Sequence, residues 1–180
     1  MARVAVLLRG VNVGRAKRVP MAEFRDVLGE LGFANARTLL NSGNAVCDAP
    51  AGRAEAHASR IHGALLTRLA VDVPVIVKSA ADVSAIVRAN PFAASALDPS
   101  RLLVALAPDA KALASLVPVE TLVEKPNAFV VGTHAAYLWC PDGFLSSKAG
   151  EALLSKAGRQ ATTRNWATVL KLEALLTAAA

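Results

Sequence analysis

The sequence predicts an α+β protein with mixed or antiparallel sheets and C-terminal helices, whose first half has the ferredoxin-like order βαββαβ. Two observations point to this fold class. Short apolar runs of strand length alternate with segments in which apolar residues recur every three or four positions, as on one face of a helix. Hydrophobic residues make up 54% of the 180 residues and charged residues 19%, a composition that favours a packed globule over extended disorder.

The first half of the chain, residues 1–78, is expected to have the element order βαββαβ. Its first apolar run is nearly continuous, which suits a strand covered on both faces. Gly32 follows the first helical pattern where a helix commonly ends, and Gly43 can adopt the positive φ of a tight hairpin turn. The elements expected are a strand over Arg3–Leu8, a helix over Met21–Leu31, a hairpin of Arg37–Leu40 and Ala45–Cys47 around Asn41–Asn44, a helix over Ala54–Leu69 and a strand over Val73–Val77.

The second half is expected to begin with the order βαββ. Residues 79–100 are expected as a helix, stopped by Asn90-Pro91, followed by a linker. Residues 101–180 are expected as a second α+β half, packed with the rest as one compact unit. Its expected elements are strands over Leu102–Leu106, Val119–Val123, Ala128–Val131 and Ala135–Trp139, a short helix opened by Pro108-Asp109, and C-terminal helices over Ala149–Ala157 and Trp166–Leu176.

Composition restricts the class of protein. The longest apolar runs fall far short of the ~20 residues that span a bilayer, and no signal-peptide cleavage pattern follows the first one, so we expect a cytoplasmic protein with no membrane partner. Cys47 and Cys140 are isolated, which favours two buried, inert thiols over a disulfide or zinc site. The net charge is +6, and five basic residues precede the first acid, Glu23, so the N-terminal end is compatible with binding a polyanion.

Several blocks of the sequence resemble the signature blocks of the bacterial domain of unknown function 1697 family. They are Leu7-Leu-Arg-Gly-Val-Asn-Val-Gly14, Val19-Pro-Met21, Thr38-Leu-Leu-Asn-Ser-Gly-Asn44 and Thr162-Thr-Arg-Asn-Trp-Ala-Thr-Val169, in this order over nearly the whole chain. The resemblance implies a duplicated ferredoxin-like α+β fold. It implies no activity, because the family is named for having none assigned.

The first candidate site is the loop from Arg9 to Gly14. It follows a strand and precedes a helix, a setting in which backbone N–H groups and a guanidinium can face an anion. Its spacing matches neither the GxGxxG loop nor the Walker loop. In the alternative interpretation, the glycines only permit a turn and Asn12 bonds the backbone locally.

The second candidate segment, Thr162–Asn165, precedes the last helix. A Thr or Asn there can cap the helix, while Arg164 lies near the positive end of the helix dipole and either pairs with a carboxylate or binds an anionic ligand. In the alternative interpretation, the segment is only a cap, with Trp166 packed in the core. Together the loops give the expected anion-binding residues Arg9, Asn12, Gly14, Asn41, Ser42, Asn44, Arg164 and Asn165.

These residues predict a protein that binds a phosphorylated or otherwise anionic partner, either nucleic acid or a nucleotide-like small molecule. The alternatives are an enzyme acting on a small anionic substrate and a protein-interaction module. No recognisable catalytic motif is present, which favours binding over catalysis. We expect no cofactor and no metal, since His57 and His62 are ~140° apart on their helix, and we leave the oligomeric state open. Convergence of the loops requires Arg9 and Arg164 to lie close together.

Overall fold

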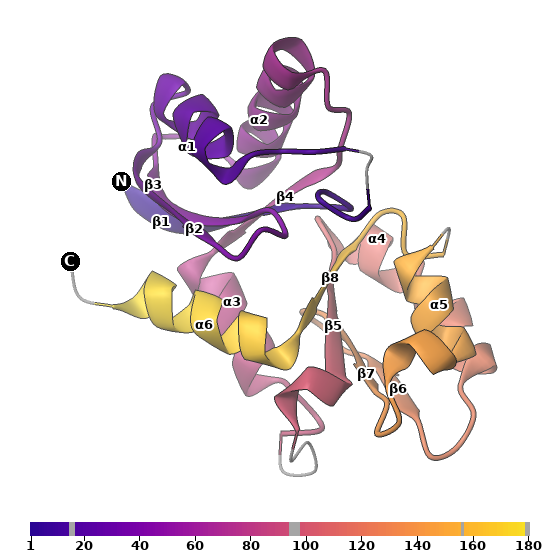
Figure 1. The fold of residues 1–180 in the computed structure, drawn as a ribbon. Coiled ribbons are helices and arrows are strands. Elements are labelled where there is room, and N and C mark those ends of the chain that lie inside the picture. The colour runs from indigo at the N-terminus through magenta and orange to yellow at the C-terminus, as the bar shows by residue number, and fades with distance from the viewer. Residues whose placement is uncertain (15–16, 94–97, 156, 179–180) are drawn as a thin grey trace. The chain divides into compact units, whose positions relative to one another are not determined.

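The computed structural model describes residues 1–14, 17–93, 98–155 and 157–178, and its chain forms two compact units (Figure 1). The first unit is Met1–Ala81 together with Ala174–Ala180, and the second is Asp82–Glu173. The first boundary therefore lies close to the expected end of the first half at residue 78. Parts of the expected linker and of the expected helix over Ala149–Ala157 lie outside the described residues.

The first unit has the element order βαββαβ that its apolar pattern predicts. Its elements are β1 (Ala2–Leu8), α1 (Met21–Glu30), β2 (Ala34–Leu39), β3 (Asn44–Ala49), α2 (Ala54–Leu69) and β4 (Val75–Ser79). The strands form one antiparallel sheet in the order β2-β3-β1-β4. All residues from Val4 to Leu8 are buried, which confirms that β1 is covered on both faces.

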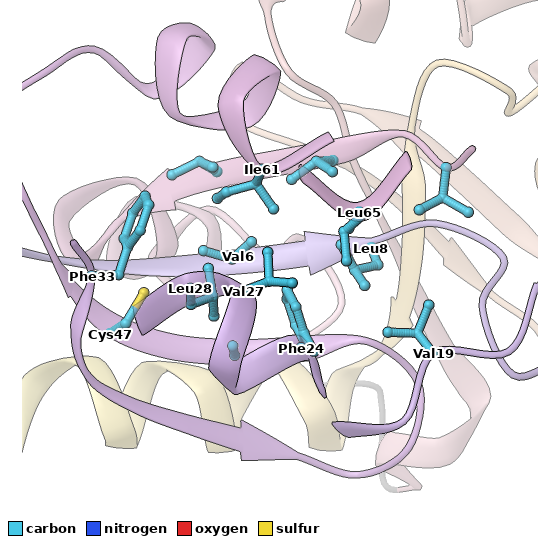
Figure 2. Close-up of a cluster of buried hydrophobic side chains, with 14 of the residues drawn as sticks. Val6, Leu8, Val19, Phe24, Val27, Leu28, Phe33, Cys47, Ile61 and Leu65 are labelled. Atoms are coloured by element: carbon cyan, nitrogen blue, oxygen red, sulfur yellow. The ribbon is translucent and has the colours of Figure 1, made fainter. Parts of the chain in front are cut away.

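The core of the first unit lies between its sheet and the helices α1 and α2, which cover one face of that sheet (Figure 1). Alternate residues of a strand share a face, so Val4, Val6 and Leu8 of β1 all enter this core. Figure 2 shows the helical side chains that lie over them, which are Phe24, Val27 and Leu28 from α1 and Ile61 and Leu65 from α2.

The second unit contains its own sheet with a related connectivity. Its elements are η1 (Pro99–Arg101), β5 (Leu102–Leu106), α4 (Ala110–Ala114), η2 (Val117–Leu122), β6 (Ala128–Val131), β7 (Ala136–Trp139), η3 (Phe144–Ser146), α5 (Lys148–Leu154) and β8 (Thr162–Asn165). The strand order β6-β7-β5-β8 is again antiparallel throughout. The expected α+β class is thus confirmed, with two four-stranded antiparallel sheets.

Two further helices complete the described chain. Helix α3 (Ala80–Arg88) follows β4, and the buried Tyr137 hydroxyl of β7 donates a hydrogen bond to the carbonyl oxygen of Ile86 in this helix, at 2.7 Å. Helix α6 (Trp166–Thr177) begins in the second unit, and its last residues belong to the first. No helix in the described residues has both the length and the apolar character needed to cross a bilayer.

Two expectations for the second half are wrong. Val119–Val123 was expected as a strand, but residues Val117–Leu122 form the 3₁₀ helix η2, in which the Val119 N–H bonds the carbonyl of Leu116. A short apolar run shows no periodicity by which a strand could be distinguished from a helix. In addition, Pro118 favours the first turn of a helix. Thr162–Asn165 was expected as a non-strand segment before the last helix, but it is the strand β8, paired with β5.

Both cysteines are free and buried, as the sequence predicts. Cys47 belongs to the core beneath α1 and α2, and Cys140 to the core of the second unit. Burial raises the pKa of Cys47 to about 12 and also raises the pKa of Cys140. Both thiols therefore stay protonated and unreactive at neutral pH.

Candidate functional site

The loop that follows β1 is built on left-handed backbone conformations. Gly10, Asn12 and Gly14 have φ values of +64°, +57° and +66°. Glycine adopts such angles without a steric penalty, and asparagine tolerates them better than other residues with a side chain. The spacing of Gly, Asn and Gly therefore gives the loop its tight course.

The Asn12 side chain holds this loop together. Its Nδ2 donates to the carbonyl oxygens of Val19 (2.9 Å) and Asn41 (2.6 Å), and its Oδ1 accepts from the Val19 N–H (2.9 Å). Both Nδ2 hydrogens are thus used inside the protein. This local bonding is the alternative that the sequence left open for Asn12, and it makes the residue a positioning group for the loop.

The turn between β2 and β3 packs against the same end of β1. The Leu8 N–H donates to the Gly43 carbonyl at 2.8 Å. The fully buried Asn44 donates through Nδ2 to the Leu39 carbonyl (3.0 Å) and the Ser42 hydroxyl (2.9 Å). Asn44 thus fixes the turn from below, while Asn41 and Ser42 are exposed at its tip.

An open groove of about 420 Å³ lies where this loop and this turn meet the start of α1. Three residues expected at the site, Asn12, Gly14 and Asn41, line it. Arg18 also lines the groove; it is exposed, and within the described residues its side chain has no hydrogen bond or ion pair. The other described residues that line the groove are Val19, Pro20 and Met21.

Helix α1 begins at this groove without a side-chain cap. Pro20 occupies the N-cap position and provides no side-chain acceptor for the first N–H groups of the helix. Those groups carry the positive end of the helix dipole. Glu23 in the first turn has a partner of its own, because its Oε2 lies 3.0 Å from Nη2 of Arg68 in α2.

Arg9 follows β1 directly and is half-buried. Its backbone N–H donates to the Pro74 carbonyl at 3.0 Å, which fixes the main chain at the start of the loop. Burial lowers the pKa of its guanidinium, although the group remains charged at neutral pH. Arg9 is not one of the residues that line the groove.

Arg164 and Asn165 belong to the second unit. The Arg164 side chain on β8 is buried, and its Nη1 donates to the Thr162 hydroxyl (2.7 Å) and the Thr163 carbonyl (2.8 Å). Burial lowers the pKa of Arg164 to about 10. Asn165 Oδ1 accepts from the N–H (2.9 Å) and the hydroxyl (2.7 Å) of Thr168, so this residue caps α6 as the sequence predicts.

The structure also defines groups whose roles the sequence did not indicate. Arg18 stood out in the sequence only as one of several N-terminal basic residues, whereas in the structure it lines the groove. Arg3 of β1 pairs with Asp48 of β3, which itself accepts a hydrogen bond from Asn35 (2.7 Å). No local motif connects these residues, because only strand pairing brings them together. Among the described residues, no cluster of three His, Cys, Asp or Glu residues could hold a metal ion.

Comparison with known proteins supports the fold and the family. The structure of the conserved bacterial protein SP0830 from Streptococcus pneumoniae aligns with a TM-score of 0.81 and 23% sequence identity, over 98% of this chain and 99% of that one. At this identity the likeness shows the fold alone. No curated protein matches the chain. The family model described as "Protein of unknown function (DUF1697)" matches residues 1–137. The block Thr162–Val169 lies beyond the matched residues, whereas the other three motif blocks lie within them. Because the match covers more than half of the sequence, the chain belongs to the DUF1697 family.

Proposed function

We propose that the chain binds a phosphorylated, nucleotide-like small molecule, with the anionic group in the groove at the start of α1. One observation carries the proposal: the uncapped N-terminus of α1 opens beside Arg18, a cation that has no partner among the described residues. Backbone N–H groups at a helix N-terminus and a guanidinium are complementary to phosphate oxygens.

The surrounding residues support this role by fixing the loops. Asn12 ties the loop after β1 to Val19 and to the turn at Asn41, so the groove is held in shape without a ligand. A preformed site binds more tightly because less conformational entropy is lost on binding. Asn44 and Ser42 act on the same site indirectly, through the shape of the turn.

One feature of the groove favours a small molecule over nucleic acid as the ligand, and another favours binding over catalysis. The groove has the size of a small-molecule site, whereas nucleic acid would require a basic stripe along the surface. The described residues that line the groove carry no carboxylate, imidazole or thiol that could act as a general base, so they supply groups for binding.

Titration of fluorescently labelled ATP and labelled single-stranded RNA, followed by anisotropy at low and physiological salt, tests the proposal. The variant Arg18→Gln should bind labelled ATP about tenfold more weakly, the usual effect of losing one charge-assisted contact. Arg53→Gln is the matched control, because Arg53 is also an exposed arginine of the first unit but lies outside the groove, near Glu55.

The possible results separate the candidates. Loss of ATP binding in Arg18→Gln but not in Arg53→Gln supports the groove. Equal binding by both variants, or no binding of ATP by the wild type, overturns the proposal. Tight RNA binding that persists at physiological salt, together with weak ATP binding, would identify a nucleic-acid ligand instead.

We also infer that the two units are duplicated ferredoxin-like halves. The support is that the strands of each unit follow one connectivity, with the first strand central, between the third and the fourth. The two free, buried thiols support a reducing compartment such as the cytoplasm.

Convergence of Arg9 and Arg164 on one ligand stays a prediction, and an Arg9→Ala/Arg164→Ala double variant in the same titration tests it.

A further inference from the structure

A second cavity of the first unit, separate from the groove, lies over strands β2, β3 and β1 of its sheet. It has a volume of about 270 Å³. Its lining includes Arg3, Arg37, Val46, Asp48, Leu175 and Ala178, and none of its lining residues belongs to the groove. A cavity of about 150 Å³ already takes benzene, so this one has room for a larger organic molecule.

Strand register explains how the cavity acquires both apolar and cationic walls. Arg37 of the edge strand β2 lies opposite Val46 of β3, and Asp48, two residues further along β3, lies opposite Arg3 of β1. Cross-strand partners share a face of the sheet, and residues two apart on one strand do as well. These side chains therefore lie on one face, where Leu175 and Ala178 from the C-terminal end of the chain supply another wall.

The charge of Asp48 is balanced within the cavity wall. Its Oδ1 lies 3.5 Å from Nε of Arg3, and its Oδ2 accepts a hydrogen bond from Asn35 at 2.7 Å. The hydrogen bond from Asn35, helped by the charge of Arg3, lowers the pKa of Asp48 below its usual value. Asp48 is therefore ionised at neutral pH and already holds partners on both oxygens.

The Arg3 side chain also has partners within the protein. Besides its pairing with Asp48, its Nη1 donates to the carbonyl oxygens of Leu176 (3.5 Å) and Ala178 (2.5 Å) at the end of α6. Cations stabilise the negative end of a helix dipole, so this contact has a structural purpose. Arg37 differs: it is exposed, and within the described residues its side chain has no hydrogen bond or ion pair.

We propose that this cavity binds a small organic carboxylate with an aliphatic or aromatic body, whose carboxylate pairs with Arg37 and whose body packs on Val46, Leu175 and Ala178. The planar guanidinium of arginine matches a carboxylate with two parallel N–H···O bonds. The apolar wall favours an organic body over a bare inorganic ion, because only the former removes apolar surface from water.

Two-dimensional NMR of the ¹⁵N-labelled full chain tests the proposal with hexanoate, benzoate, inorganic phosphate and the uncharged analogue hexanol. We expect hexanoate and benzoate to shift the backbone signals of Val46, Asp48 and Leu175. Arg37→Gln should weaken their binding about tenfold, and Leu175→Trp, which fills the cavity, should abolish it. Arg18→Gln, in the separate groove, should leave carboxylate binding unchanged.

Each result decides the question. Saturable shifts at the cavity that depend on Arg37 support the site, and their persistence in Arg18→Gln shows that it is independent of the proposed phosphate groove. Absence of these shifts, equal binding of hexanol and hexanoate, or undiminished binding in Arg37→Gln overturns it. A thermal melt of Arg37→Gln that matches the wild type verifies that the exposed substitution leaves the fold intact.

Discussion

The two units differ at the N-terminus of the helix that follows their first strand: this helix has a side-chain cap in the second unit and none in the first. In the second unit, α4 begins soon after β5, and Asp109 caps it by accepting a hydrogen bond from the Ala112 N–H at 2.7 Å. In the first unit, the longer loop between β1 and α1 ends in Pro20, which provides no side-chain cap. The same point of the strand connectivity is thus closed by a side chain in one unit and borders a groove with Arg18 in the other. This contrast locates the candidate ligand site in the first unit.

The hydrophobic cores of the two units also differ, because the helices that cover the sheets differ in length. Helices α1 and α2 of the first unit have 10 and 16 residues, whereas α4 and α5 of the second have 5 and 7. The first core therefore buries large helical side chains such as Phe24, and the second relies more on alanine and on the 3₁₀ helix η2. One strand connectivity thus tolerates two different helical layers.

The largest expected effect concerns these cores. Phe24→Ala should lower the free energy of unfolding by about 3 to 5 kcal/mol, because Phe24 is fully buried. Leu113→Ala in α4 should cost about 2 to 3 kcal/mol, since Leu113 is smaller and keeps slight exposure on a short helix. Urea unfolding of both variants measures the difference. A larger loss for Leu113→Ala would contradict the contrast between the cores.

The next effect compares the hairpin turns. Gly43 has a φ of +75°, and an added Cβ would lie 2.7 Å from both Leu8 Cβ and Val11 Cγ2. Gly43→Ala should therefore destabilise the protein by about 2 to 4 kcal/mol. Gly132, in the β6–β7 turn, lacks a positive φ, and an added Cβ would lie 3.2 Å from the Ala135 carbonyl oxygen and 3.4 Å from Tyr137 Cε2, so Gly132→Ala should cost below about 1 kcal/mol. Chemical denaturation distinguishes them, and equal costs would refute the argument.

A third prediction removes the difference between the two caps. Pro20→Ser places a neutral capping hydroxyl at the start of α1 and should stabilise it by about 0.5 to 1 kcal/mol relative to Pro20→Ala. The same hydroxyl should compete with the ligand and weaken labelled ATP binding relative to Pro20→Ala. Asp109→Ala should cost about 1 kcal/mol and leave ATP binding unchanged. Identical ATP affinities of the two Pro20 variants would separate the groove from the helix N-terminus.

The smallest expected effect is a dependence of stability on pH. Hydrogen bonds from Asn35 and from Ser100 lower the pKa of Asp48 in the first unit and of Asp98 in the second. A carboxyl with a lowered pKa stabilises the folded state above its unfolded pKa, near 3.9, and that stability is lost as the pH falls through the folded pKa. Asp48→Asn and Asp98→Asn should each therefore cost more at pH 7 than at pH of about 3. Costs that do not change with pH would contradict these assignments.

The sequence predicts the first unit better than the second, for physical reasons. Helix α2 has the long apolar repeat that identifies a helix, and β1 has the continuous apolar run of a doubly covered strand. The strand β8 contains mainly polar residues, and its strand character depends on main-chain pairing with β5. Such pairing is tertiary information that a local pattern does not contain.

The candidate site was predicted only in part. Asn12, Gly14 and Asn41 do line one groove, because the loops that contain them meet at the same end of the sheet. Their sequence did not reveal that Asn12 uses both its donors on Val19 and Asn41, or that Arg18 supplies a cation of the groove. Bonding partners separated along the chain depend on the fold, whereas the turn-forming tendency of Gly and Asn is local.

The return of the last residues to the first unit has a consequence for synthesis of the chain. Because Ala174–Ala180 belong to the same unit as Met1–Ala81, that unit is not continuous in sequence. Domains usually fold in order as they leave the ribosome. Here Arg3 acquires its helix-end partners, the carbonyls of Leu176 and Ala178, only after residues 82–173 of the second unit have been synthesised. The first unit is therefore completed after the second, and a fragment cut after residue 81 would lack Leu175 and Ala178, which form one wall of the cavity proposed to bind a carboxylate.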